Sequence, residues 1–262
     1  MEFFDNLTSA IPGKYIVKKT SPFSYFIQSK HLKIHFVQIE KYNTTIYQNE
    51  IQVLREKNGH FTTVFEDVFK SNPEKLIKRL KYHSGKSYRI HGRETALKKI
   101  TKPEAIEFLE KNHGNIPLKT KYNLGLLNKK KQLVAIACFG QVIRMRNGAK
   151  SSELIRFCSL SGSRVVGGLT KLIYYFKKLH QLDELMTYCD LEWSNGENFQ
   201  KLGFEKIDTF SPVEFVVNMN SWERMHISQF QDRVDLDETN KKEFRTVLNM
   251  GSIKFIKYFN EK

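Results

Sequence analysis

The stretch MTYCDLEWSNGENFQKLGF, residues 186–204, gives the clearest indication of the fold. Its first half is apolar enough for a buried strand, which delivers Asp190 into a polar Trp-Ser-Asn-Gly turn, and a short helix follows. α/β folds place site residues where a strand ends in such a turn. We therefore interpret Asp190 as a site residue. The alternative is that it caps the turn at Ser194 and Asn195.

The composition is that of a folded, strongly basic protein. The chain has 262 residues, of which 40% are hydrophobic, so it can bury a core. Lys and Arg outnumber Asp and Glu by 43 to 28, which gives a formal charge of +15. This excess predicts a polyanionic partner, most simply double-stranded DNA. The alternative is that the chain is a soluble protein from a lysine-rich proteome. Net charge bears on association and not on fold.

The cysteines and the chain start indicate an intracellular protein. Cys138, Cys158 and Cys189 lie far apart in apolar runs, without the spacing of a zinc site. The first ten residues lack the basic and apolar regions of a signal peptide. No apolar run approaches ~20 residues, so no membrane span is expected. We predict a cytoplasmic protein; the sequence does not define its oligomeric state.

Periodicity and capping residues predict an α/β chain in three parts. Residues 1–100 form a small unit with a hairpin at 24–40, a helix at 44–59, a strand at 60–69 and a helix at 71–85. Residues 101–220 begin with a helix at 101–114. A hairpin, a strand, a glycine turn, a helix, a strand, a short helix and a final strand follow. Residues 221–262 form a charged extension.

The order of elements in 101–220 resembles the GNAT acyltransferases, which implies a mixed sheet with flanking helices. In that fold, backbone amides at a helix start bind the pyrophosphate of the acyl donor. Here RVVGGL supplies Arg164, Gly167 and Gly168 as cofactor-binding residues, although Leu169 stands where the family has a small residue. The resemblance implies acetyl-CoA or a related acyl donor. The alternative is a glycine turn that admits close helix–strand packing.

A series of short motifs resembles the Mom DNA-modification proteins, a divergent GNAT-like group, and the C-terminal domain of phage-type homing endonucleases. The motifs occur in the family's order, and the resemblance points to a phage-encoded chain. They are KNHG, KYNLGLL, SELIRFCS and TYCDLEWSNGENFQKLGF, and NMGSIKFIK resembles the closing strand of the endonucleases. The family transfers a small acyl-derived group to the exocyclic amine of adenine in DNA.

The resemblance nominates His113, Tyr122 and Asp190 as catalytic residues and Arg156 as substrate-binding. His113 or Asp190 would accept a proton from the attacking amine, and Arg156 would hold a phosphate or an oxyanion. Phe199 stands where the family has a tyrosine, so a hydroxyl is lost. The remaining residues assigned to the substrate are Ser194, Asn195 and Phe199. Each of these four residues also has a structural explanation. His113 would end a helix, Asp190 would cap a turn, Arg156 would be a surface residue of a strand and Tyr122 would be a core residue.

The first unit resembles very-short-patch-repair-type nucleases of the restriction-endonuclease fold. Those enzymes hold Mg²⁺ with an Asp and a Glu, but Ser24 and His35 occupy these positions here. Glu40 could substitute for only one carboxylate. We therefore expect no metal and a DNA-holding role for this unit. The residues assigned to DNA phosphates are Lys75, Lys78, Arg79, Arg144 and Arg146.

Two functions from different classes follow from these patterns. The first is a DNA-binding, GNAT-like transferase that modifies a base in DNA. The second is a non-catalytic or formerly nucleolytic DNA-binding protein. An ordinary acetyltransferase of small amines or proteins is a third hypothesis, against which Leu169 and the basic excess argue. The sequence defines neither the donor, nor the base and its context, nor the choice between DNA and RNA.

Overall fold

The computed structural model describes residues 2–114, 118–233 and 243–259. The chain forms two compact units, each built from segments that are separate in sequence. Unit 1 comprises residues 1–84, 190–195 and 209–252, and unit 2 comprises 85–189, 196–208 and 253–262. The boundaries predicted from the sequence fall after residues 100 and 220, in a linear order. Residues 234–242 and 260–262 of the predicted extension lie outside the described residues.

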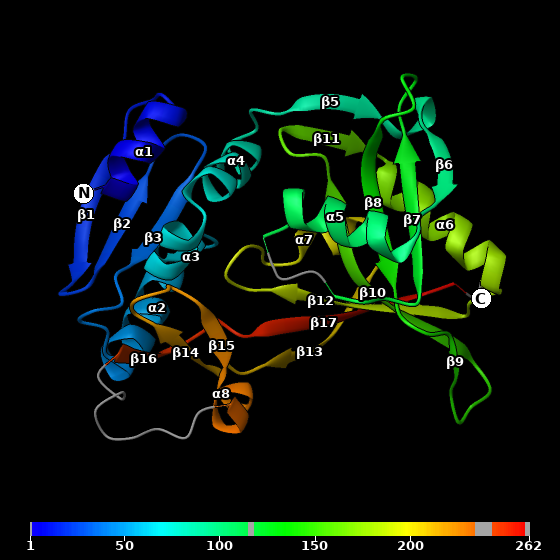
Figure 1. Ribbon diagram of the computed structural model, residues 1–262. Helices are drawn as coiled ribbons and strands as arrows, with labels where there is room; N and C mark the ends of the chain where they lie inside the picture. Colours follow the sequence, from blue (N-terminus) through cyan, green and yellow to red (C-terminus); the bar gives the residue numbers. More distant parts are fainter. Residues whose placement is uncertain (1, 115–117, 234–242, 260–262) are drawn as a thin grey trace. The chain divides into compact units, whose positions relative to one another are not determined.

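The first segment of unit 1 follows the order helix, three strands, helix, strand, helix, helix (Figure 1). These first elements are α1 (Glu2–Ala10), β1 (Ile16–Ser21), β2 (Ser24–Gln28), β3 (Lys33–Val37), α2 (Thr44–Asn58), β4 (Thr62–Phe65), α3 (Glu66–Ser71) and α4 (Pro73–His83). A later segment adds β14 (Glu214–Asn218), β15 (Arg224–His226), α8 (Ile227–Arg233) and β16 (Phe244–Leu248).

The sheet of unit 1 has the order β1-β2-β3-β4, with β3 and β4 parallel and the other neighbours antiparallel. Alternation along β3 places Ile34 and Phe36 on the face covered by α1 and α4. Val37 lies on the other face, against Tyr47 and Ile51 of α2. The second sheet, β15-β14-β16, contributes residues to this α2-side core. Both faces of the first sheet are therefore covered.

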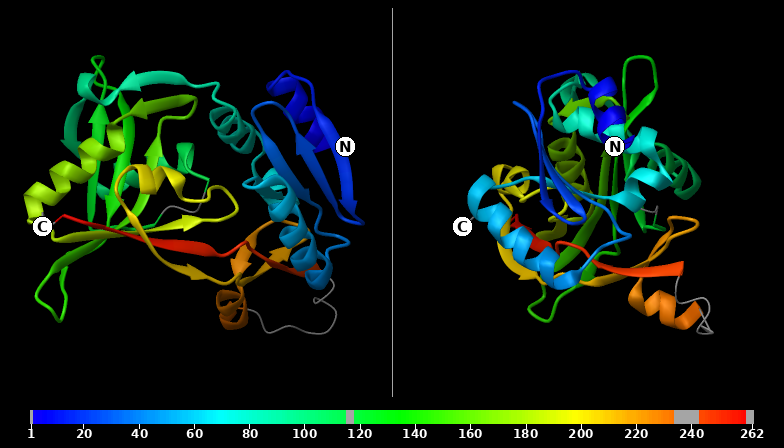
Figure 2. Two further views of the ribbon diagram at one scale, coloured as in Figure 1. Left: turned by 180° about the vertical axis from the view of Figure 1, so that it is seen from behind. Right: turned by 90° about the vertical axis from the view of Figure 1, so that its left-hand side faces the viewer.

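Unit 2 contains the remaining elements (Figures 1 and 2). They are β5 (Tyr88–His91), η1 (Gly92–Glu94), β6 (Ala96–Lys99), α5 (Lys102–Asn112), β7 (Tyr122–Leu127), β8 (Leu133–Phe139), β9 (Ile143–Arg144), β10 (Lys150–Ser159), β11 (Ser163–Val166), α6 (Gly168–His180), β12 (Glu184–Asp190), α7 (Glu197–Lys201), β13 (Glu205–Phe210) and β17 (Ser252–Tyr258). No helix in the described part of the chain is long and apolar enough to cross a membrane.

The main sheet of unit 2 is mixed, with the order β13-β17-β12-β10-β8-β7-β6. The strands β6, β7, β8 and β10 are antiparallel neighbours, whereas β10 and β12 are parallel and are joined through α6. α5 packs over Cys138 and Cys158 on one face. On the other face, Phe176 of α6 stacks on Phe139 with ring centroids 3.9 Å apart. The predicted mixed sheet with flanking helices is therefore confirmed.

Local sequence signals explain several element boundaries. Thr101 and Glu104 form a capping box at the start of α5, and Asn72 caps α4 by accepting from the Lys75 amide. The prediction of one strand over 60–69 is wrong, because β4 ends at Phe65 and α3 begins at Glu66. The spacing of the apolar residues in VFEDVF fits both the two-residue period of a strand and the 3.6-residue period of a helix.

Two glycines with similar backbone angles give a matched test of packing in unit 2. Gly196 has φ +83° and a Cβ there would stand 2.3 Å from Cζ of the buried Phe255, whereas Gly162 has φ +78° with no atom within 4 Å. We expect Gly162→Ala to cost about 1 kcal/mol of strain. Gly196→Ala should cost about 2 kcal/mol more, because the clash adds to the strain. Denaturant unfolding measures both, and equal losses would contradict the packing.

Candidate functional site

The strands β10 and β12 separate partway along their length. Their parallel ladder runs from Ser151 opposite Glu184 to Leu154 opposite Thr187. The Thr187 hydroxyl donates to the Leu154 carbonyl across this last pair, at 2.9 Å. β10 continues to Ser159 and β12 to Asp190, and a bulge between Leu154 and Arg156 changes the register of β10 with β8. Beyond Leu154, the edge of β10 that faces β12 is therefore not covered by that strand.

The connection from β10 to β12 passes through β11, a glycine turn and α6. Gly167 precedes the helix with φ +73°, and a Cβ there would meet no atom within 4 Å, so the space beside this turn is open. A Cβ on Gly168 would stand 2.8 Å from Val165, so this glycine permits the close packing of α6. The first amides of a helix lack intrahelical acceptors, so the open turn exposes hydrogen-bond donors. Arg164 is exposed on β11, three residues before Gly167.

The structure places Tyr122 and Arg156 on opposite faces of the sheet. Tyr122 pairs with Phe139, and its ring contacts Phe176 and His180 of α6 at centroid distances of 5.5 and 4.5 Å. Arg156 pairs with Cys138, on the face covered by α5. Because successive strand residues alternate in direction, the two side chains do not converge.

Two further predicted residues of unit 2 belong to α5 and α7. His113 ends α5, on the sheet face that also carries Arg156, and its backbone amide donates to the Leu109 carbonyl. Phe199 lies in α7 and packs its ring against Phe204 and Phe255, at centroid distances of 5.4 and 5.7 Å. Phe199 is therefore a packing residue of α7.

Asp190 belongs to unit 1, with Ser194 and Asn195. Its Oδ1 accepts from the Glu192 amide at 2.9 Å, and its carbonyl accepts from the amides of Trp193 and Ser194. The Asp190 side chain thus caps a turn of its own segment at the Glu192 amide. The alternative drawn from the sequence placed this cap at Ser194 and Asn195. Ser194 and Asn195 continue this turn.

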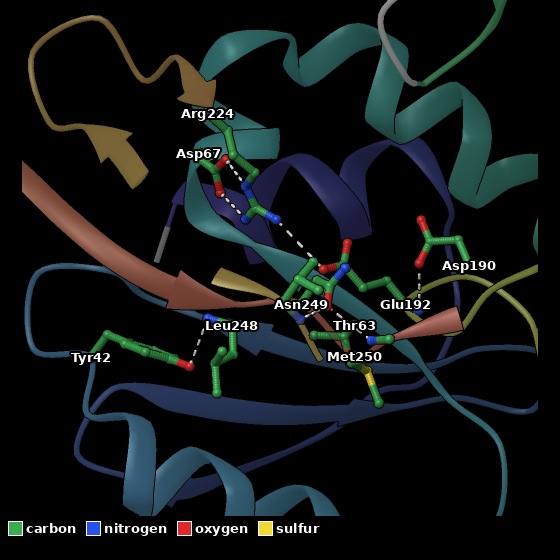
Figure 3. Close-up of polar contacts among 11 residues, drawn as sticks. Tyr42, Thr63, Asp67, Asp190, Glu192, Arg224, Leu248, Asn249 and Met250 are labelled. Carbon is green, nitrogen blue, oxygen red and sulfur yellow. Dashed lines mark hydrogen bonds and ion pairs between the residues drawn. The ribbon is translucent and has the colours of Figure 1, made fainter. Parts of the chain in front are cut away.

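A buried ionic cluster lies beside this turn in unit 1 (Figure 3). Arg224 of β15 makes a bidentate pair with Asp67 of α3, in which Nε–Oδ2 and Nη2–Oδ1 both measure 2.7 Å. Its Nη1 lies 3.5 Å from Glu192 Oε1. The guanidinium carbon stands 4.6 Å from the centroid of the Phe65 ring. The arrangement ties β15 and the 190–195 segment to the first sheet of unit 1.

Burial raises the pKa of Glu192 to about 8, because the charged form is poorly solvated there. The carboxylates of Asp190 and Asp67 act in the same direction, and Arg224 opposes them. Burial lowers the pKa of Arg224, but Asp67 and Glu192 together hold it above its ordinary value. Glu192 therefore keeps its proton to a higher pH than an exposed glutamate does. Neither Glu192 nor Arg224 was identified from the sequence, since their contacts join segments far apart in the chain.

Ser24 and His35, which the sequence resemblance aligns with the carboxylates of a nuclease site, lie in a second buried polar cluster of unit 1. The Ser24 hydroxyl donates to Glu50 of α2, and His35 Nε2 lies 3.4 Å from Glu50 Oε1. Burial raises the pKa of Glu50, but the nearby His35, Ser24 and Thr20 side chains outweigh it and hold the pKa below its ordinary value.

Glu50, rather than Glu40, is thus the carboxylate beside Ser24 and His35. The signal in the sequence was a glutamate in the apolar stripe of Tyr47, Ile51 and Leu54. Among the described residues, no group of three or more His, Cys, Asp or Glu side chains is arranged to hold a metal ion.

The basic residues assigned to DNA have different surroundings. Lys78 pairs with Glu74 along α4, and the Arg79 guanidinium stacks 3.4 Å from the centroid of the Trp193 ring. Lys75 lies half-buried in the first turn of α4. Arg144 and Arg146 are exposed on the hairpin between β9 and β10, which projects from the sheet of unit 2 (Figure 1).

No protein-family model matches the chain. The comparison with curated proteins also gives no match.

The chain is similar to solved acetyltransferase structures at low identity. One is the ribosomal-protein-S18-alanine N-acetyltransferase of Escherichia coli, with 11% identity over 64% of this chain and 96% of that chain and a TM-score of 0.39. Another is a Bacillus subtilis acetyltransferase in complex with CoA, with 12% identity over 63% and 99% of the two chains and a TM-score of 0.39. A third is Arabidopsis thaliana Naa50 with a bisubstrate analogue, at 11% identity over 63% and 99% and a TM-score of 0.38. Similarity at this level does not define an activity.

The protonation of Glu192 predicts a pH dependence of the stability of unit 1. An unfolded glutamate loses its proton near its ordinary pKa of about 4.3, so between there and about pH 8 only the folded state holds the proton. Stability is therefore lost as pH rises through this window, and Glu192→Gln should remove that loss.

As the pH rises from 5 to 7, the free energy of unfolding of the wild type should fall relative to that of Glu192→Gln, by roughly 1 kcal/mol per pH unit. Denaturant unfolding at several pH values measures the difference. Glu56→Gln, on the exposed side of α2, is the control and should parallel the wild type. Parallel curves for Glu192→Gln as well would contradict the raised pKa.

Proposed function

We propose that unit 2 is an acyltransferase of the GNAT type that uses acetyl-CoA or a related thioester donor. The observation that carries this proposal is the pair of parallel strands β10 and β12, joined through α6, whose ladder ends at Leu154 and Thr187. The separation leaves a strand edge on which an extended donor can bind through backbone hydrogen bonds. The open turn at Gly167 lies at the start of the helix between these strands, where donor phosphates would bind.

The proposed reaction transfers the acyl group from sulfur to nitrogen. The amine attacks the thioester carbonyl, a carbon–nitrogen bond forms, the carbon–sulfur bond breaks and the thiol leaves. The amine must lose a proton, which requires an acceptor within hydrogen-bond reach. The sequence resemblance assigns this role to His113 or Asp190, of which His113 lies in unit 2. CoA is the first donor to test, because the resemblance of the RVVGGL segment implies a CoA thioester.

The acceptor in this proposal is the exocyclic amine of a base in DNA. Two features support it: the motif resemblance to DNA-modification proteins, and the formal charge of +15. The exposed Arg144 and Arg146 on the projecting hairpin are suited to contact phosphates, because their charges have no ion-pair partner among the described residues. Unit 1 would then serve as the DNA-holding module.

A second candidate function is supported by the placement of the predicted residues. Tyr122 and Arg156 lie on opposite faces of the sheet, so they cannot act on one substrate atom together. A non-catalytic nucleic-acid-binding protein does not require them to converge. The presence of a serine and a histidine where the nuclease family has metal-binding carboxylates agrees with this alternative.

A substitution at Gly167 tests the donor site without straining the turn. Asparagine tolerates the left-handed conformation, so Gly167→Asn should fold normally while its side chain fills the open space. We expect the affinity for CoA, measured by isothermal titration calorimetry, to fall by about tenfold or more. Gly148→Asn, at a glycine with φ +85° on the exposed hairpin, is the matched control and should bind CoA as the wild type does. Undiminished binding by Gly167→Asn would exclude this turn as the donor site.

The two candidate functions differ in their product, and both predict salt-dependent DNA binding. Changing Arg144 and Arg146 together to Gln should lower the slope of log affinity against log salt by about 2. Lys129 and Lys130, on the turn between β7 and β8, are changed together to Gln as the control pair.

Mass spectrometry of nucleosides from DNA of expressing cells then decides between the two candidate functions. A new modified nucleoside supports the transferase, and its absence with DNA binding intact supports the binding protein.

A further inference from the structure

Unit 1 contains a cavity that none of the functions discussed so far uses. It has a volume of about 360 Å³ and lies between α2 and the residues at Pro212 and after β16. This volume is within the range of small-molecule pockets, roughly 300–1,000 Å³, and is far larger than one water molecule needs. Exposed side chains of α2, among them Gln52 and Arg55, surround its mouth. Its inner wall consists of the buried Tyr47, Ile51, Leu248 and Met250.

The two walls of this cavity are held in place by hydrogen bonds of the protein itself. The Leu248 amide donates to the hydroxyl of Tyr42, just before α2 begins, at 3.2 Å (Figure 3). Asn249 Oδ1 accepts from the amides of Val213 at 2.8 Å and Gly251 at 3.0 Å, which fixes the wall opposite the helix. The cavity is therefore preformed, and a ligand can enter it with little further ordering of the chain.

Tyr47 brings a polar group to the otherwise apolar inner wall. Its side chain is 2% exposed, and its hydroxyl has no hydrogen-bond partner within the described part of the chain. Buried hydroxyls are normally paired, because an unpaired one has lost its hydration without compensation. Burial raises the pKa of Tyr47 well above its ordinary value, so the hydroxyl keeps its proton and can donate. It lacks an acceptor, and the adjoining cavity has room for one.

Arg55 places a cation at the mouth of the same cavity. Among the residues that the structure describes, none forms an ion pair with it. Burial dominates the pKa of Tyr47, but the charge of Arg55 lowers it, so the guanidinium lies within electrostatic reach of the hydroxyl. The neighbouring Glu56 accepts from Gln52 Nε2 at 3.2 Å, along the helix. The cavity thus combines an apolar wall with two donors that lack an acceptor.

We propose that this cavity binds a small carboxylate with an apolar body. The carboxylate would lie between the Arg55 guanidinium and the Tyr47 hydroxyl, and the body against Ile51, Leu248 and Met250. An apolar cavity of about 150 Å³ accommodates a benzene ring, so this one has room for a body of about two fused rings. A phosphate monoester would bring about two charges to a wall with a single cation, whereas a carboxylate matches it. The inference goes beyond the proposed function, because it gives unit 1 a small-molecule ligand.

The test compares three probes by isothermal titration calorimetry on the full chain. They are 2-naphthoate, octanoate and the neutral 2-naphthalenemethanol. Binding of either carboxylate supports the site, and the tighter of the two shows whether the body is aromatic or aliphatic. We expect 2-naphthalenemethanol to bind about tenfold more weakly than the preferred carboxylate, because it brings no charge to the guanidinium.

Four variants locate the ligand in the cavity. Arg55→Gln should weaken carboxylate binding by about tenfold and leave 2-naphthalenemethanol unchanged. Tyr47→Phe should weaken carboxylate binding by about fivefold without lowering stability to urea, because it removes a hydroxyl that has no partner. Gln52→Trp places an indole at the mouth and should block all three probes. Lys57→Gln, an exposed cation of α2 outside the cavity lining, is the charge-matched control and should bind as the wild type does.

The outcomes separate a carboxylate site from an apolar cavity and from no site. A wild type that binds neither carboxylate overturns the inference. Equal affinity for 2-naphthalenemethanol, or an equal loss in Lys57→Gln, removes the specific role of Arg55 and overturns the carboxylate. Binding that survives Gln52→Trp places the ligand elsewhere and overturns the cavity as its site. None of these results bears on the donor site proposed for unit 2, because every variant lies in unit 1.

Discussion

The early end of the ladder between β10 and β12 is the constraint on which the candidate site of unit 2 depends. Parallel strands normally stay paired because each strand satisfies the backbone groups of its neighbour. Here the bulge near Leu154 turns β10, and its edge beyond this residue is left to another partner. The helix between the two strands begins at a glycine turn with open space, and the β5–β11 ladder is anchored beside that turn. The strand edge, the turn and the ladder thus follow one another along a single connection.

Two buried polar clusters join different elements of unit 1. Arg224 pairs with Asp67, while burial raises the pKa of Glu192 by more than the attraction of Arg224 lowers it. In a second cluster, a single carboxylate, Glu50, is shared by Ser24 and His35. Both clusters join residues from different elements. They specify how the elements of unit 1 pack on its first sheet, rather than a site for a hard cation.

Much of the local structure was predictable from the sequence, because it depends on neighbouring residues. The hairpin of β2 and β3, the Asn72 cap and the capping box at Thr101 follow from patterns only a few residues long. The helix at Glu66 was not predictable in this way: the Glu66 side chain accepts from the Ile39 amide and Asp67 pairs with Arg224, both distant in sequence. The same limit applies to the site. The motif residues can be named from the sequence, but the sheet face on which each lies depends on strand register, which separates Tyr122 from Arg156.

The position of β17 has a consequence for the synthesis of the protein. This strand, Ser252–Tyr258, lies between β12 and β13, although it is translated after both of them. On the ribosome, β12 and β13 therefore emerge before their common neighbour exists, and their facing edges are open to other strands until residue 258 leaves the exit tunnel. The intervening segment contains β14, β15 and β16, which join unit 1. Nascent unit 2 therefore matures only after most of unit 1 has been made, and a nascent chain stalled before β17 exposes two sheet edges to aggregation.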